Sequence, residues 1–203
     1  MDQRTAYSGA GQASALQTNK VLRNTYMLLA MTLTFSALCS WVTAAIGIGP
    51  GAAMGMSLAA LVMIFFLNKA AESSMGILFV FAFTGLLGGS LGYTLSYYAG
   101  IQGGSELIMQ AFGATALVFF GLSGYVLTTK KDFSFMGGFL IVGLIVAVVA
   151  SLANLFFQVP ALSLAISAAI VFIMSGFILY DTSRIINGGE TNYIRATVSM
   201  YLN

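Results

Sequence analysis

One carboxylate follows directly on a long apolar run, and it is the strongest candidate for chemistry in this sequence. Asp181 ends the run AISAAIVFIMSGFILYD. Ionisable side chains within apolar segments are expensive to desolvate, so they commonly handle protons or cations. The alternative is a carboxylate at the edge of the segment that pairs with Arg184, one helical turn away. Both interpretations stay open, and the candidate charge partners of this carboxylate are Lys69, Arg184 and Arg195.

Other kinds of active site find little support in the composition. The chain contains no histidine, which excludes His-dependent serine or cysteine catalysis and metals bound by His. An aspartyl protease within a membrane needs two carboxylates that share a proton, and no second Asp lies within an apolar run. We therefore expect a protein that is not an enzyme, with no cofactor, no metal site and no nucleic-acid partner.

The composition explains why a single carboxylate stands out. Only 7% of the residues are charged and 59% are hydrophobic, whereas about a quarter are charged in a soluble domain. Such a chain must be solvated by lipid, where each crossing takes about 20 helical residues and isolated strands leave backbone groups unpaired. We predict an all-α membrane protein with six full transmembrane helices, near residues 24–46, 52–68, 75–97, 107–129, 134–157 and 160–181.

The two ends of the chain differ from these six segments. Residues 1–20 are polar, and we expect them to form a flexible cytoplasmic tail ahead of a transmembrane domain over residues 21–203. The segment from Tyr193 to Asn203 is about half as long as a crossing. It is either the first part of a seventh helix or a short helix at the membrane edge.

The basic residues predict the orientation. With six crossings, all eight Lys and Arg residues fall on one side, and the opposite loops near 47–51, 98–106 and 158–159 contain none. The positive-inside rule places the basic side, with the N-terminus, in the cytoplasm. Glu106 is the acidic residue of the opposite side. It either suits the N-terminus of its helix or attracts cations to an outer vestibule.

Glycines within the predicted helices indicate close helix contacts. Gly88 and Gly92 form a pair of small residues four apart, a spacing that lets two helices approach closely in lipid. We expect a tight packing contact here. The alternative is a point at which helices slide or bend during gating.

Several stretches resemble one known family. They include AFGATALVFF at residues 111–120, the preceding glycine-rich FAFTGLLGGSLGYTL, and the run FILYDTSRIINGGETNYIRATVSMY. With VLRNTY and VLTTKKDFSFMGG, they are similar to the Bax inhibitor-1 family, also called transmembrane Bax inhibitor motif proteins, and most of all to its enterobacterial branch. The resemblance covers residues 18–201 and implies six helices around a central seventh, in the bacterial inner membrane.

The resemblance implies two different functions. Members of the enterobacterial branch are described as partners and modulators of FtsH, a membrane-anchored AAA+ protease. Our first expectation is that this chain modulates FtsH in the same way. We expect the protease to contact the polar tail. Other members are pH-sensitive calcium leaks, in which two aspartates on helices six and seven share a proton. Asp181 would be the first, but Asn203 stands in place of the second, and an amide cannot lose a proton. A calcium leak gated by Asp181 is therefore the alternative.

Overall fold

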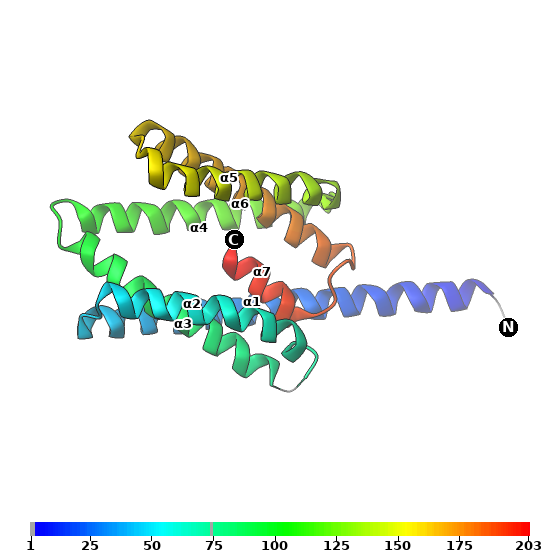
Figure 1. Cartoon of the computed structure of the whole chain (residues 1–203). Coiled ribbons are helices and arrows are strands. Elements are labelled where there is room, and N and C mark those ends of the chain that lie inside the picture. Colours follow the sequence, from blue (N-terminus) through cyan, green and yellow to red (C-terminus); the bar gives the residue numbers. More distant parts are fainter. Residues whose placement is uncertain (1–2, 74) are drawn as a thin grey trace. The chain divides into compact units, whose positions relative to one another are not determined.

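The computed structural model describes residues 3–73 and 75–203, with side chains from Leu16 onwards, and this part contains helices but no strand. Six of the helices are long and apolar enough to cross a membrane, which confirms the predicted all-α multi-pass class. Figure 1 shows α1 (Gln3–Ile46), α2 (Pro50–Ala70), α3 (Gly76–Ala99), α4 (Gly104–Thr129), α5 (Gly137–Phe157), α6 (Pro160–Ile186) and α7 (Tyr193–Leu202), with a short 3₁₀ turn at Ser134–Met136.

Helix α1 begins well before the apolar run that predicts its membrane crossing. It runs without interruption from Gln3, and the flexibility and cytoplasmic location of residues 1–20 stay predictions. Extending an existing helix adds one hydrogen bond for each ordered residue and avoids the cost of a new nucleus. The Ala, Gln and Leu residues of this segment are also good helix formers. Polarity alone therefore did not reveal where the backbone becomes helical.

The helices fall into two compact units. The first contains residues 1–115 and 190–202, and the second contains residues 116–189 together with Asn203. Each unit includes membrane-spanning helices, so the division lies within the predicted transmembrane domain of residues 21–203.

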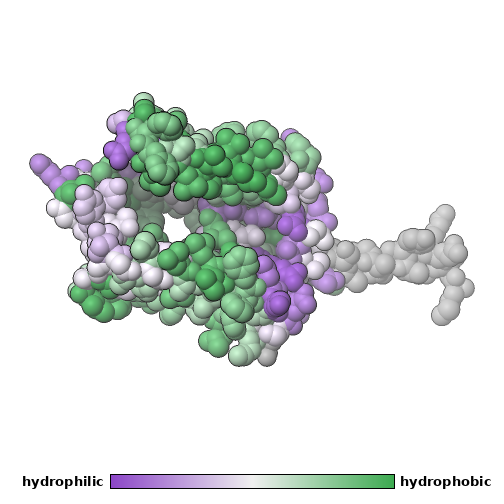
Figure 2. All heavy atoms as spheres, viewed as in Figure 1, coloured by the Kyte–Doolittle hydropathy of each residue, from purple (hydrophilic) through white to green (hydrophobic). Residues whose placement is uncertain are grey.

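In the first unit, α3 contacts both α1 and α2, and α7 packs against α1 and α3. Their shared core includes Leu28, Leu67, Phe83, Ile194 and Val198. Many large apolar side chains remain on the outside, and Figure 2 shows apolar surface along the helices with hydrophilic side chains gathered toward helix ends. This distribution is the one expected for helices whose outer surface is solvated by hydrocarbon.

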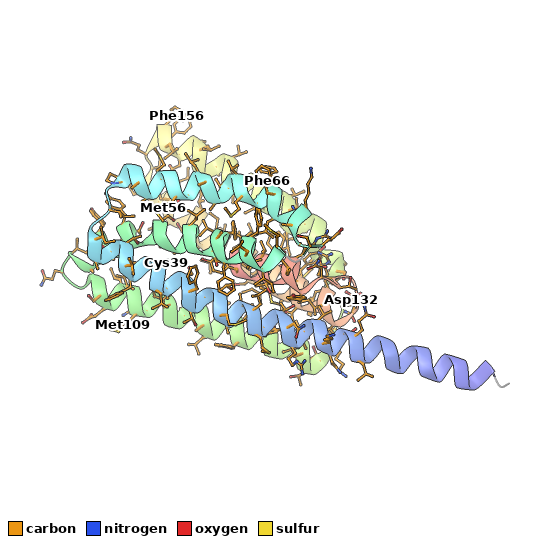
Figure 3. The ribbon with its side chains drawn as sticks, turned by 90° about the horizontal axis from the view of Figure 1, so that it is seen from below. Cys39, Met56, Phe66, Met109, Asp132 and Phe156 are labelled. Carbon is orange, nitrogen blue, oxygen red and sulfur yellow. The ribbon has the colours of Figure 1, made fainter. Side chains whose placement is uncertain are left out.

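The contact between α1 and α3 depends on small residues. A side chain at Gly88 would overlap the backbone of Ser36, and one at Gly92 would lie 2.6 Å from the backbone oxygen of Ser40. The hydroxyl of Thr43 donates a hydrogen bond to the backbone oxygen of Gly89, at 2.8 Å, across the same contact. Figure 3 shows Cys39 on α1 and Met56 on α2, whose side chains lie beside neighbouring glycines of α3.

In the second unit, α5 and α6 pack against each other around Leu140, Ala147 and Ile173. The two-residue connection between them begins at Gln158, whose φ of 51° ends α5. The side-chain oxygen of Asn154 accepts a hydrogen bond from the backbone N–H of Val159 at 3.1 Å. This short turn holds the two helices side by side.

Candidate functional site

The structure brings the two residues of the candidate pair together. Asp181 lies in the last turns of α6 and is only 8% exposed. Asn203, which follows α7, donates a hydrogen bond from Nδ2 to Oδ2 of Asp181 at 2.8 Å. A buried carboxylate needs such a donor, because burial without one is costly. The pair combines one acid with one amide, so it holds one titratable proton rather than two.

The residues that follow Asp181 fasten the connection between α4 and α5 to α6. Thr182 and Ser183 are fully buried. The Ser183 hydroxyl accepts a hydrogen bond from the backbone N–H of Phe133 at 2.8 Å and donates one to Oδ1 of Asp132 at 3.3 Å. The α4–α5 connection is therefore held two residues away from the candidate carboxylate, a link that no pattern in the sequence indicated.

Asp132 is also bonded within its own loop. Its Oδ1 accepts a hydrogen bond from the backbone N–H of Ser134 at 2.8 Å. The hydroxyl and the backbone N–H of Ser134 are the main causes that lower the pKa of Asp132 below its usual value, and Ser183 adds to the effect. The carboxylate therefore stays ionised at neutral and mildly acidic pH.

The three candidate charge partners lie in different surroundings. Arg184 donates to the backbone oxygen of Gly189 at 3.1 Å, and its guanidinium lies 5.5 Å from the centre of the Tyr180 ring. Its pairing with Asp181 stays a prediction. Arg195, in the first unit, forms an ion pair with Glu72 at 2.5 Å. Lys69 lies exposed in the last turn of α2.

Asn192 caps α7 and ties it to the α2–α3 connection. Its Oδ1 accepts hydrogen bonds from the backbone N–H groups of Ile194 and Arg195, at 2.9 and 3.3 Å. Its Nδ2 donates to the backbone oxygen of Ala71 at 2.8 Å. Glu190 supports the cap by accepting a hydrogen bond from the N–H of Asn192. An N-cap of this kind typically contributes about 1 kcal/mol, and an Asn just before a helix is a signal that the sequence already contained.

A cavity of about 800 Å³ lies beside Tyr201 in the first unit. The Tyr201 hydroxyl bonds to the Ser36 hydroxyl at 2.6 Å and donates to the backbone oxygen of Thr84 at 3.3 Å. The described residues that line the cavity are mostly apolar, and none of them is Asp, Glu, Lys or Arg. An ion in this cavity would meet no compensating charge from these residues.

The remaining candidate, Glu106, lies exposed in the first turn of α4. This position fits both of its interpretations, a helix N-terminus that favours negative charge and a group open to the outside. Among the side chains that the structure describes, no three His, Cys, Asp or Glu residues lie together in a way that could hold a metal ion.

Comparisons with known proteins connect both units to one family. Residues 18–203 match the model of the family described as "Inhibitor of apoptosis-promoting Bax1". A Vibrio cholerae "Uncharacterized membrane protein" is 54% identical over 189 residues, which cover 93% of this chain and 85% of that protein. An Escherichia coli protein, "Modulator of FtsH protease YccA", is 48% identical over 201 residues, 98% of this chain and 91% of its own length. A Pseudomonas aeruginosa relative is 47% identical over 192 residues.

Proposed function

The chain belongs to the Bax inhibitor-1 family, and from this premise we propose that it modulates an FtsH-type protease in the bacterial inner membrane. The observation that carries the proposal is the similarity, over 98% of the chain, to a protein named as a modulator of FtsH. The identity of 48% extends over 201 residues, which cover 91% of that protein's own length. The role is regulatory, with no chemical reaction of its own.

The polar helix ends are the parts that a membrane-anchored protease can reach. In the first unit, the Arg195–Glu72 ion pair and the capped start of α7 form one such end. The amino-terminal part of α1 extends beyond α2, α3 and α7 of the same unit (Figure 1). We propose that this end faces the cytoplasm, because the basic residues gather on this side of the predicted crossings, and that the protease contacts residues 1–20 there.

Deleting residues 2–18 tests this proposal. The deletion should abolish the effect of the protein on FtsH substrates while the first unit stays folded, because buried side chains of α1 such as Val21 and Leu28 lie beyond the deleted segment. The measurement is the half-life of a membrane-bound FtsH substrate in cells that carry the wild-type or shortened protein. In a control variant, residues 2–18 are replaced by a Gly/Ser segment of equal length. This variant distinguishes an effect of the tail's amino-acid sequence from an effect of its length. Unchanged half-lives at equal protein levels would refute the role of the tail.

A calcium leak gated at Asp181 is the second candidate. It is favoured by one observation, the burial of this carboxylate against Asn203 near the end of a membrane-spanning helix. Intramembrane carboxylates that can gain or lose a proton are common in ion pathways. We expect the flux to depend less on pH than it would with a pair of acids, because the amide of Asn203 keeps its protons over the whole pH range tested.

Calcium flux into proteoliposomes distinguishes this candidate. If Asp181 gates a leak, wild-type flux should change between about pH 6 and pH 8, and Asp181→Asn should remove that change. Glu106→Gln is the matched control, since it removes an exposed carboxylate elsewhere and should leave the pH dependence intact. Wild-type flux no greater than that of empty vesicles would exclude the leak and would leave the protease proposal untouched.

A further inference from the structure

Two adjacent lysines end α4 in the second unit. Lys130 and Lys131 are both exposed, and Lys130 has a φ of 52°, in the left-handed region. Its backbone N–H still donates to the oxygen of Val126 at 2.8 Å, so the helix closes there and the chain turns sharply. In the described part of the chain, neither lysine ammonium forms an ion pair. Nζ of Lys131 lies over the Tyr125 ring, 5.8 Å from its centre, within the range of a cation–π interaction.

The acidic neighbour of these lysines is engaged elsewhere. Asp132 uses the same oxygen to accept hydrogen bonds from the N–H of Ser134 and the hydroxyl of Ser183. These contacts direct the carboxylate toward its own loop and α6 rather than toward the ammonium groups. Because the N–H of Phe133 also bonds to Ser183, the connection is attached to α6 at two residues, and both lysine side chains are exposed.

The position of the pair along the chain sets its depth in the membrane. One candidate span ends at Thr129 and the next begins at Ser134, so the lysines lie where hydrocarbon gives way to headgroups. Just inside the second span, Phe135 is 81% exposed and Phe139 is 67% exposed. Two cationic groups are thus followed along the chain by two exposed apolar rings, and these match the two parts of a phospholipid, an anionic phosphate and its acyl chains.

We propose that Lys130, Lys131, Phe135 and Phe139 form a binding site for an anionic phospholipid. The phosphate lies against the two ammonium groups, and the acyl chains lie along the two rings. A free phosphate ion would use only the lysines, and an acidic protein segment would leave the rings uncovered, so the combination favours a lipid. This site is separate from the candidate pair Asp181 and Asn203 and does not depend on the proposed effect on FtsH.

Titration of the full-length protein in detergent with fluorescent phosphatidylglycerol tests the site, with phosphatidylcholine as the uncharged comparison. The double variant K130Q/K131Q should weaken phosphatidylglycerol binding about twenty-five-fold, because each basic side chain near an anionic lipid contributes about fivefold. Phosphatidylcholine binding should not change. The matched control K20Q/K69Q removes two other exposed lysines and the same charge, and it should weaken binding by less than about threefold.

Two further variants keep the test independent of folding. Asp132→Asn retains an oxygen acceptor but removes the negative charge, so binding should tighten severalfold, a gain that misfolding cannot produce. F135S/F139S should weaken phosphatidylglycerol binding while the melting temperature stays unchanged. Equal losses in K130Q/K131Q and K20Q/K69Q would overturn the proposal in favour of overall charge. Displacement of the lipid by millimolar inorganic phosphate, or no loss in F135S/F139S, would overturn it in favour of a simple phosphate site.

Discussion

Replacing Gly88 with alanine should lower the free energy of unfolding by about 3 kcal/mol. The added methyl group would overlap the backbone oxygen and Cα of Ser36, and backbone atoms of a packed helix cannot move aside as the end of a flexible side chain can. Overpacking of this kind typically costs 1–3 kcal/mol and more where the backbone must shift. Since α1 and α3 form the most extensive helix contact of the first unit, the loss should be visible as an earlier transition in thermal or SDS-induced unfolding in detergent.

Gly113→Ala is the matched control for this prediction. A side chain at Gly113 of α4 would meet no atom within 4 Å, so alanine there should stabilise its helix by up to about 1 kcal/mol. The two substitutions are chemically identical and should have opposite signs. If Gly88→Ala were as stable as Gly113→Ala, the close approach of α1 and α3 would be wrong, and the pair Gly88 and Gly92 would need another explanation.

The six membrane-spanning helices could be predicted because few backbone conformations are stable in hydrocarbon. Every backbone N–H and C=O must be satisfied within the segment, so apolar length alone fixes the class and places the helix ends within a few residues. The amino-terminal extension of α1 could not be found in this way. It lies outside the apolar run, where helix and coil differ by small propensity terms, and no strong pattern decides between them.

The sequence pointed to those residues of the candidate site that are unusual in their context, but not to those whose residue types are common there. Asp181 stands out because few charged residues follow directly on an apolar run, and the resemblance to the family pointed to Asn203. The link from Asp132 to Ser183 joins residues 51 positions apart and uses side chains that are ordinary in loops and helix ends. Likewise, several charges share one side of the predicted topology, so the sequence could not decide that Arg195 pairs with Glu72.

Replacing Asn203 with aspartate should make the stability of the protein fall as the pH rises. The amide nitrogen of Asn203 lies 2.8 Å from Oδ2 of Asp181, and two carboxyl groups this close can remain together only if they share a proton. The folded variant would then bind one proton more than the unfolded chain at any pH above about 4. Stability should therefore be retained below that pH and fall by up to about 1.4 kcal/mol per pH unit above it, until the shared proton is lost.

Melting temperatures of the wild type, Asn203→Asp and Asn203→Leu between about pH 4 and pH 8 test this prediction. Asn203→Leu removes the hydrogen bond without adding a charge, so its loss of stability should not grow with pH as that of the aspartate variant does. Parallel curves for the aspartate and leucine variants would contradict a close pair. The same aspartate variant also bears on the leak hypothesis. If calcium flux depends on pH in Asn203→Asp but not in the wild type, pH-dependent gating requires a second carboxyl group beside Asp181. The amide of Asn203 would then be the reason that the wild-type protein is not gated by pH.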